Sequence, residues 1–487
     1  MDWQVSSLRR ATVMVCVTVL TAGAYFFSFG FHRIWWLVWL APLPILLLAP
    51  RLRMWQAFVI GLAARSLGTL NVWNYLHHVV QFPLWLVLIT VLVPAASFAL
   101  AIVFYRGLLR NGSPWLATLA FPMTIVAAEY LFSLSQGTFF NTGYTQLENL
   151  PVLQLAAIAG LWGISFSVNL FSSGMAAFVS ASPKGRLRLA MVLVVFYVGV
   201  FSYGKMRLSS TPQASPSVLV GLVETHAGAK IFPVDAEPTL ALMQEYAAEV
   251  GPLTAQGAKF IVFPEMSALV PDPVLSQIDE LFQRTARAAH VQILLGVLHI
   301  TNHAGYNEGR LYSATGEIET VYRKHHLVPT WEARSTPGTE LSVLSQPVGR
   351  IGIEICRDMD YPELARRYAK QQVGLVLVPA WDQGVNVDAA WHGHLSLMRG
   401  VENGFPMVRD AKNGLLTVSD DRGRILAEKP TRSDGTLVTM LAAVPVRHDS
   451  TLYQKWGDWF AWVDIIALVV LLMFYITNPK QSAMVTE

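Results

Sequence analysis

The stretch GRIGIEICRDMDYPELARRYAKQQVGLVLVPAW, residues 349–381, contains the pattern that decides the fold of this chain. An apolar run ends at Cys356, a segment with helical spacing follows from Pro362, and a second apolar run leads to Trp381. Short apolar runs rich in β-branched residues are typical of buried strands. Strands that alternate with helices predict a layered α/β fold.

The same alternation extends over residues 217–457. The apolar runs SVLVGLVET, KFIVFPEMS and VQILLGVLHI predict three more strands, and segments with helical spacing separate them. Residues 306–324 predict a hairpin whose turn lies at 314–316. The strand-to-helix turns carry no GxGxxG or P-loop pattern, so the sequence does not favour nucleotide binding.

The rest of the chain has the composition of a membrane protein. Hydrophobic residues make up 53% of the chain and charged residues only 14%, whereas soluble domains carry roughly 25% charged residues. Apolar runs of ~20 residues can cross a bilayer. We predict about eight spans, near residues 11–30, 34–50, 54–76, 82–105, 115–135, 156–181, 189–206 and 458–477.

These spans define the predicted domains. Residues 1–207 form a transmembrane bundle, 208–216 a linker, 217–457 the α/β domain, and 458–487 a final transmembrane helix with a short cytoplasmic tail. The positive-inside rule sets the orientation. A cytoplasmic start places most loop cations inside, namely Arg9, Arg10, Arg51, Arg53, Arg106, Arg110, Lys184, Arg186, Arg188 and Lys480, and leaves only Arg33 in a short outer loop.

Seven spans before the α/β domain therefore place that domain outside the cytoplasm. The run 34–50 is short and contains Pro42 and Pro44, and its loss would reverse the orientation. Two ionisable residues, Arg65 and Glu129, lie within or at the edge of spans. Intramembrane charges usually face a bundle interior, so a helix-pairing role and a functional role are both open.

Other classes of function find little support in the sequence. The net charge is only +3 and no basic run is interleaved with aromatic residues, so we expect no nucleic-acid partner. The two cysteines, Cys16 and Cys356, form no disulfide scaffold. The histidine pairs 325–326 and 392/394 match no metal-site signature, so we expect no metal.

Three residues at the ends of strands could carry out acyl chemistry. Glu265 follows an apolar strand, where partial desolvation would raise its pKa and suit a general base. Lys324 could stabilise an oxyanion, and Cys356 could be the nucleophile. Each alone has a structural alternative: a loop-entry carboxylate, a solvated basic cluster and a small buried thiol. Arg357 is a candidate for keeping the thiol ionised.

A family resemblance joins these residues. The segments FPE (263–265) and YRKHHLVP (322–329), and a cysteine followed by YPEL (361–364), resemble the Glu–Lys–Cys triad of the carbon–nitrogen hydrolase (nitrilase) superfamily. The segments FSFGFHRIWWLVWLAPLPILLLAP (27–50) and HLVPTWE (326–332) resemble the apolipoprotein N-acyltransferase family. The resemblance covers nearly the whole chain in the same order.

The resemblance implies a fold and a set of residue roles. The fold is an α-helical transmembrane bundle with a nitrilase-like four-layer α-β-β-α sandwich. Glu265 is then the base, Lys324 the oxyanion stabiliser and Cys356 the nucleophile, with Glu332 as a second active-site glutamate and Arg357 beside the thiol. No cofactor is implied.

The resemblance also implies a reaction and its substrates. Cys356 takes an acyl chain from a phospholipid as a thioester, which then passes to the α-amine of the lipidated N-terminal cysteine of an apolipoprotein. The implied location is the bacterial inner membrane, with the catalytic domain on the periplasmic side. Nothing in the sequence calls for more than a monomer.

Some positions depart from the family pattern. Arg357-Asp358 replaces Tyr-Glu, Thr330-Trp331 replaces Phe-Gly, and residues 379–382 (PAWD) replace Ser-Asn-Asp-Ala-Trp and are closer to soluble amidases. Two alternatives therefore stay open. One is a membrane-tethered amidase or an acyltransferase to another amine, and the other is a lipid or lipoprotein binder without activity.

Overall fold

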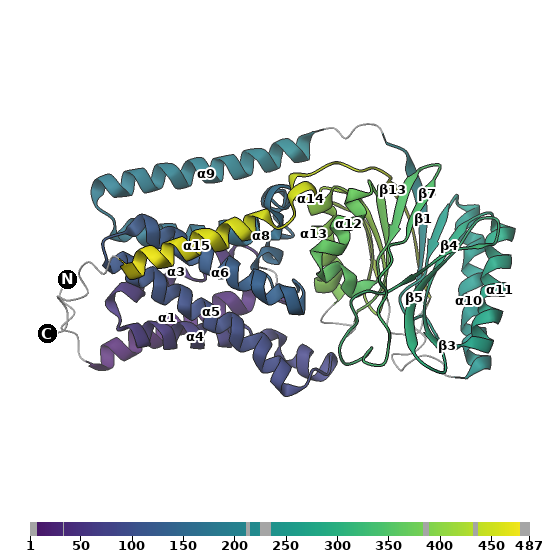
Figure 1. Cartoon of the computed structure of the whole chain (residues 1–487), viewed down its shortest axis with the longest axis horizontal. Helices are drawn as coiled ribbons and strands as arrows, with labels where there is room; N and C mark the ends of the chain where they lie inside the picture. The colour runs from purple at the N-terminus through teal and green to yellow at the C-terminus, as the bar shows by residue number, and fades with distance from the viewer. Residues whose placement is uncertain are drawn as a thin grey trace. The chain divides into compact units, whose positions relative to one another are not determined.

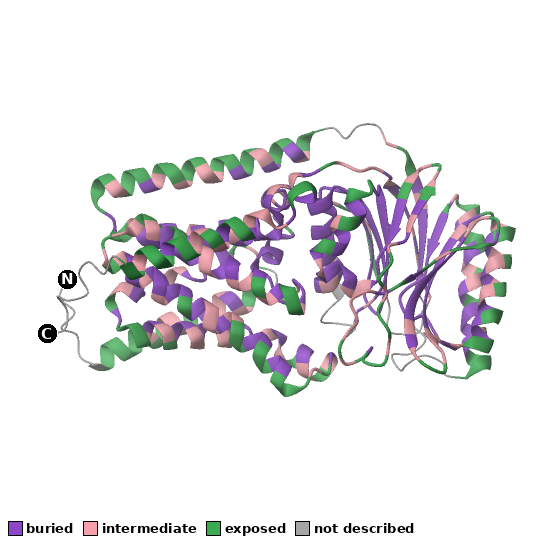
Figure 2. Cartoon of the chain, viewed as in Figure 1, coloured by how far each residue is buried: buried purple, intermediate pink, exposed green. Residues whose placement is uncertain are grey.

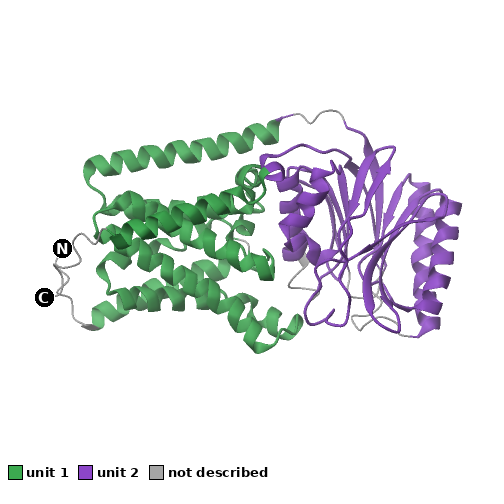
Figure 3. Ribbon diagram, viewed as in Figure 1, with its two compact units in different colours: residues 1–209, 456–487 green, residues 210–455 purple. Residues whose placement is uncertain are grey.

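The chain divides into two compact units, residues 1–209 with 456–487 and residues 210–455 (Figure 3). The computed structural model describes residues 7–32, 34–210, 215–224, 235–382, 389–431 and 437–477. Part of the predicted linker, residues 211–214, and the cations Arg33 and Lys480 lie outside the described residues.

The first unit is a bundle of apolar helices. In the described residues, six helices are long and apolar enough to cross a membrane. They are α1 (Ser7–Ser28), α5 (Leu84–Arg110), α6 (Pro114–Gln136), α8 (Ala156–Ser180), α9 (Pro183–Ser209) and α15 (Trp459–Thr477). Each coincides with a predicted span, which confirms a multi-pass membrane protein.

The other two predicted spans are interrupted, so the count of eight is not confirmed. The run 34–50 forms the short helices α2 (Leu37–Leu40) and α3 (Leu43–Leu48) and the 3₁₀ turn η1 (Ala49–Arg51). Its prolines lack the backbone N–H that a continuous helix needs. The run 54–76 forms α4 (Met54–Gly68), which has only 15 residues, then η2 (Leu70–Val72) and the π-helical turn η3 (Tyr75–Val79).

The second unit contains two sheets. The strand order is β13-β1-β2-β4-β5-β6 in the first sheet, with β3 beside β4, and β12-β11-β10-β9-β8-β7 in the second. The strands are β1 (Ser217–Glu224), β2 (Phe260–Val262), β3 (Leu269–Pro271), β4 (Gln292–Ile300), β5 (Gly305–Tyr312), β6 (Ile318–Arg323), β7 (Val343–Gln346), β8 (Gly349–Ile353), β9 (Leu375–Trp381), β10 (Met407–Lys412), β11 (Leu415–Ser419), β12 (Ile425–Pro430) and β13 (Val438–Pro445).

Helices cover the outer face of each sheet (Figure 1). Helices α10 (Ala236–Ala255) and α11 (Asp272–Ala289) pack on the first sheet, and α12 (Pro362–Lys370) and α13 (Ala389–Asn403) on the second. The facing sides of the sheets share an apolar core that includes Val220, Leu222, Leu377 and Val408. The strands are largely buried (Figure 2). This arrangement confirms the four-layer α-β-β-α sandwich.

Parallel pairing places several strand ends at one edge. Strand β2 runs parallel to β1 and β4 in the first sheet, and β9 runs parallel to β8 and β10 in the second. The predicted hairpin forms as the antiparallel pair β5–β6, so β6 ends in the same direction as β4. Ligand sites of α/β folds collect at such carboxyl ends of strands.

Candidate active site

A buried cluster of one lysine and two glutamates lies where β2 and β6 end. The Lys324 Nζ atom donates to Glu265 Oε1 and to Glu332 Oε2, each at 2.7 Å. All three residues are at most 2% exposed. Asn307 of β5 closes the network, because its Nδ2 donates to Glu265 at 2.7 Å and to Glu332 at 2.6 Å. The structure thus brings Glu265 into contact with Lys324, which lies 59 residues further along the sequence.

Backbone hydrogen bonds hold the cluster. The amide of Lys324 donates to the carbonyl of Asn307 at 2.9 Å as β6 ends. Glu332 closes a tight turn: its amide donates to the Val328 carbonyl at 2.9 Å, and its Oε2 accepts from the Val328 amide at 2.7 Å. The amide of Glu265 donates to the carbonyl of Ala380 at 3.2 Å, which joins the edges of the two sheets.

The charges of this cluster are coupled. Burial raises the pKa of Glu265 above its ordinary value, and Lys324 opposes that rise. Burial lowers the pKa of Lys324, but Glu265 and Glu332 outweigh burial and the net shift is upward. Lys324 is therefore a fixed cation at neutral pH. A fixed cation in a dry site can stabilise negative charge that develops on a reacting atom.

Cys356 follows β8 at the edge of the second sheet. Its backbone φ is +46°, a left-handed conformation that side chains other than glycine rarely adopt. Its Sγ lies 3.6 Å from the carbonyl oxygen of Trp381 at the end of β9. Burial raises the pKa of the Cys356 thiol well above its ordinary value, Glu265 adds to this, and Lys324 and Arg409 oppose it. The resting side chain is therefore a neutral thiol.

This result differs from the expectation of an ionised thiol beside Arg357. The Arg357 guanidinium donates to the Leu327 carbonyl and lies 5.5 Å from the ring centroid of Tyr361. Helix α12 begins at Pro362, as the sequence predicts, and the 3₁₀ turn η5 (Cys356–Asp360) separates it from the thiol. Removal of the thiol from water outweighs the positive charges nearby.

Asp358, which together with Arg357 departs from the family pattern, organises the turn after Cys356. Its buried carboxylate accepts hydrogen bonds from Tyr322 Oη at 2.7 Å and from the amides of His326 at 2.8 Å and Ile355 at 3.1 Å. Although burial opposes it, Asp358 and Glu363 raise the pKa of His326 to about 9. Asp358 thus ties the segment after Lys324 to the turn that carries Cys356.

The segment 379–382 forms one wall of the site. Its carbonyl oxygens at Ala380 and Trp381 contact Glu265 and Cys356, as described above. Asp382 is fully buried and accepts two hydrogen bonds from Arg409, at 2.9 and 2.5 Å. The rings of Trp381 and Trp331 lie 5.9 Å apart. The amidase-like residues therefore position the Trp381 backbone carbonyl next to the thiol.

Sequence reasoning missed Asn307 and Asp358. Asn307 lies inside the polar run YNEGR, and its pattern does not differ from that of a solvent-facing strand. Asp358 stands in the sequence only as part of the Arg357-Asp358 departure from the family pattern, which indicates no role for it. Across the described part of the chain, no group of three or more His, Cys, Asp or Glu residues could hold a metal ion.

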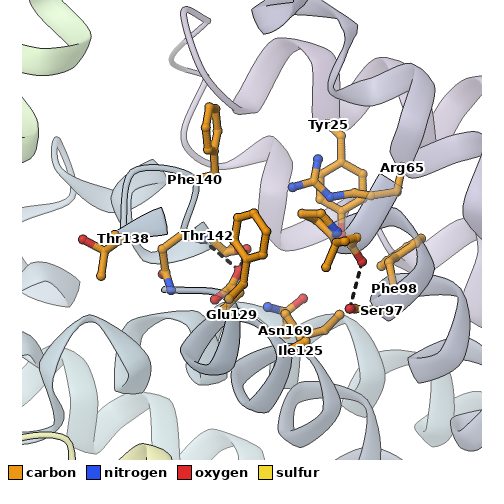
Figure 4. Close-up of a pocket in the computed structure, with 16 residues that line it drawn as sticks. Tyr25, Arg65, Ser97, Phe98, Ile125, Glu129, Thr138, Phe140, Thr142 and Asn169 are labelled. Carbon is orange, nitrogen blue, oxygen red and sulfur yellow. Dashed lines mark hydrogen bonds between the residues drawn. The ribbon is translucent and has the colours of Figure 1, made fainter. Parts of the chain in front are cut away.

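A second polar site lies inside the bundle, where Arg65 and Glu129 line one cavity (Figure 4). The Arg65 guanidinium lies 4.6 Å from the ring centroids of both Tyr25 and Phe29. Glu129 Oε1 accepts from the Thr142 amide at 2.9 Å and from its hydroxyl at 2.5 Å. The cavity is about 40 Å³, which is room for about three waters. These contacts tie helices and a loop together and favour a structural role.

Two family models match the chain, each over one region. The carbon-nitrogen hydrolase model matches residues 224–447, and the model of the apolipoprotein N-acyltransferase N-terminal domain matches residues 21–174 in the bundle. The chain belongs to the apolipoprotein N-acyltransferase family. This family member is 26% identical over 477 residues to the apolipoprotein N-acyltransferase of Geobacter metallireducens, which covers 89% of this chain and 90% of the relative.

The chain is similar to other proteins over shorter stretches. The apolipoprotein N-acyltransferase of Shewanella oneidensis is 24% identical over 412 residues, covering 77% of this chain and 76% of the relative. Among solved structures, the nitrilase-superfamily amidase of Nesterenkonia AN1 is 20% identical with a TM-score of 0.42, covering 52% of this chain and 98% of the amidase. The identities of 26% and 24% to the two apolipoprotein N-acyltransferases mark the chain as a divergent family member.

Proposed function

We propose that this protein is an apolipoprotein N-acyltransferase that works through a Glu265–Lys324–Cys356 triad. The observation that carries the proposal is the buried Glu265–Lys324–Glu332 network at the same strand edge as the only described thiol of the α/β unit. The described residues of the same chain include six helices long and apolar enough to cross a membrane, which suits lipid substrates.

The first half-reaction forms a thioester. Glu265 accepts the Cys356 thiol proton as Sγ attacks the ester carbonyl of a phospholipid, and Lys324 stabilises the oxyanion. Collapse of the tetrahedral intermediate breaks the ester C–O bond. The leaving alkoxide takes the proton from Glu265 and departs as a lysophospholipid. Burial raises the pKa of Glu265, which makes it a stronger base for the thiol proton.

The second half-reaction transfers the acyl group to an amine. The α-amine of a diacylglyceryl-modified apolipoprotein attacks the thioester, Glu265 takes a proton from the nitrogen, and the C–S bond breaks. The proton then returns to sulfur and an amide is formed. Glu332 and Asn307 keep Lys324 and Glu265 in place. The aromatic surface of Trp331 and Trp381 helps to keep water from the thioester.

We place the α/β unit on the periplasmic side of the bacterial inner membrane, because loop cations gather on the opposite side. The test uses exposed positions in a Cys16→Ser background that keeps the partly buried Cys356. A membrane-impermeant maleimide should label Asn302→Cys in the α/β unit, but not Lys184→Cys at the start of α9. Labelling of Lys184→Cys alone would reverse the orientation.

The function is tested with purified protein in phospholipid vesicles and a diacylglyceryl-cysteine peptide. Mass spectrometry should detect an acyl adduct on Cys356 and then the N-acylated peptide. Cys356→Ser should abolish the N-acylated product. Cys16→Ser removes the other cysteine, on α1, and should leave activity intact.

The same experiment also distinguishes the proposed function from its main alternative. The amidase-like segment 379–382 forms a wall of the site and favours small-amide hydrolysis as the second candidate. A protein that hydrolyses small amides and forms the Cys356 adduct, but never acylates the peptide, would be a membrane-tethered amidase or a transferase to another amine. A protein that binds lipid and is indifferent to Cys356→Ser would be a binder without activity.

A further inference from the structure

Helix α9 packs loosely against the rest of the bundle (Figures 1 and 2). Only 17% of its most apolar window is buried, against 83% for α8. Its hydrogen bonds to the bundle include one at mid-helix, from Tyr197 Oη to the Ser167 carbonyl at 2.8 Å, and one near its end, from Arg207 to Gln154 at 2.7 Å. A helix with so much exposed surface can leave space along its flank.

That space is a long apolar groove of about 880 Å³. It is lined by α9, by α8 and by the segment around α2, with Phe171, Phe178 and Trp39 among its aromatic walls. The exposed Ser202 and Lys205 lie together near the C-terminal end of α9. The groove is therefore apolar along its length and cationic towards one end of α9.

The surrounding bilayer determines which molecules can occupy such a groove. Water is excluded from the hydrocarbon region, and an empty space would forfeit the dispersion contacts of its walls. The lining residues of α9 run from Ala190 to Lys205, which is about 22 Å at 1.5 Å per residue. One leaflet of the hydrocarbon core is about 15 Å thick, so an acyl chain fits within that length.

The charge of Lys205 indicates which class of lipid would bind in the groove. A lysine ammonium binds phosphate as a point charge through as many as three donors. A lipid with acyl chains and a phosphate head matches both the apolar walls and Lys205. We propose that the groove between α8 and α9 is a phospholipid-binding site, with the acyl chains along Phe171 and Val194 and the phosphate against Lys205.

This site is distinct from the catalytic cluster and does not depend on the proposed reaction. It lies on the last helix before the α/β unit in the chain. A bound lipid would supply the packing that α9 lacks, and so would stabilise the helix that leads to β1.

The test is photo-crosslinking in vesicles with phosphatidylglycerol that carries a diazirine in one acyl chain. The full-length protein carries Cys356→Ser, so that a lipid adduct cannot form at that thiol. Peptide mapping should place crosslinks in residues 190–205 and 171–178. Val194→Trp narrows the groove and should lower the yield about tenfold, the equivalent of about 1.4 kcal/mol. Lys205→Glu should lower it about threefold.

Matched controls lie on the same helix. Val195 is 71% exposed and does not line the groove, and Lys184 is an exposed cation at the opposite end of α9. Val195→Trp and Lys184→Glu should leave the crosslink yield unchanged. Equal crosslinking around the whole of α9, or yields indifferent to both groove variants, would show only the general lipid shell and overturn the proposal. If Val194→Trp does not fold, Lys205→Glu decides alone.

Discussion

The candidate catalytic cluster (Glu265, Lys324 and Glu332) and the bundle cavity each bury a glutamate near a cation, but they stabilise these charges in different ways. In the α/β unit, Lys324 contacts both carboxylates at 2.7 Å. In the bundle, Arg65 lies between two aromatic rings and Glu129 bonds to Thr142, and within the described residues no ion pair joins them.

The difference indicates what each site is built for. A buried ion pair adds little net stability, since the desolvation cost is large, so a tight lysine–carboxylate network at a strand edge points to chemistry. The bundle charges instead bond to a neighbouring loop and face aromatic rings, which ties helices together. We therefore expect substitutions in the cluster to damage catalysis and substitutions in the cavity to damage stability.

The largest effect is expected from Lys324→Met. It leaves Glu265 and Glu332 buried without their cation, so catalysis should fall at least ~10³-fold. The free energy of unfolding should fall by about 3–5 kcal/mol. N-acylation rates and thermal unfolding in detergent measure both. Lys259→Met, at an exposed lysine before β2, is the control. A Lys324→Met variant that kept a tenth of wild-type activity would contradict the expectation that substitutions in the cluster damage catalysis.

Substitutions of the two glutamates of the cluster should slow the reaction to different extents. Glu265→Gln removes the base and should slow thioester formation by ~10²–10⁴-fold. Glu332→Gln keeps the hydrogen-bonding shape and should cost roughly tenfold, because Glu332 acts through Lys324. Single-turnover mass spectrometry of the Cys356 adduct separates them. Equal losses would mean that Glu332 also exchanges protons with the substrate.

A third buried carboxylate, Glu224, extends the comparison to pH. It is fully buried, and the backbone of Asn413 lies within hydrogen-bonding range of its carboxylate. Burial raises its pKa to about 7, with Lys412 opposing the rise. The folded state therefore favours neutral Glu224, and that stability is lost as pH rises from about 4.5 through 7.

The Glu224→Gln variant tests the direction of this dependence of stability on pH. The variant should be more stable than wild type at pH 8, by on the order of 3 kcal/mol, and nearly equal to it at pH 4.5. Thermal unfolding across that range is the measurement. Glu245→Gln, on the exposed face of α10, should show no such pH dependence. A constant difference at all pH values would indicate a packing effect instead.

Substitutions in the bundle cavity should have smaller effects on activity and stability than substitutions in the cluster. Arg65→Met removes the cation from between Tyr25 and Phe29 and should lower thermal stability by about 2 kcal/mol. The turnover number should change less than about threefold. Arg65→Lys keeps a cation and should lose less stability. A large loss of turnover in a stable Arg65→Met protein would give the cavity a functional role.

The sequence predicted what depends on local pattern. The strand–Cys356–helix order and the β5–β6 hairpin follow from short apolar runs and a turn, and the structure confirms them. The grouping of Glu265, Lys324 and Glu332 came from the family resemblance, because no local rule joins residues this far apart. Their catalytic roles stay predictions.

The sequence could not predict features set by tertiary contacts. Hydropathy counted the run 34–50 as a span, although its prolines break it into short helices. Asn307 and Asp358 gain their roles only through partners from other elements. The state of the Cys356 thiol depends on burial, which neighbouring charges in the sequence do not reveal.

The smallest effect is expected from Arg357→Ala. The groups that shift the Cys356 pKa most are its burial, Glu265, Lys324, Arg409 and Asp382. The Arg357 guanidinium instead bonds to the Leu327 carbonyl. The midpoint of iodoacetamide reaction against pH should therefore stay within ~0.3 unit of wild type, or under ~0.5 kcal/mol. A midpoint one unit higher would assign Arg357 to the electrostatics of the thiol, and the raised pKa would then reflect a balance of charges more than burial.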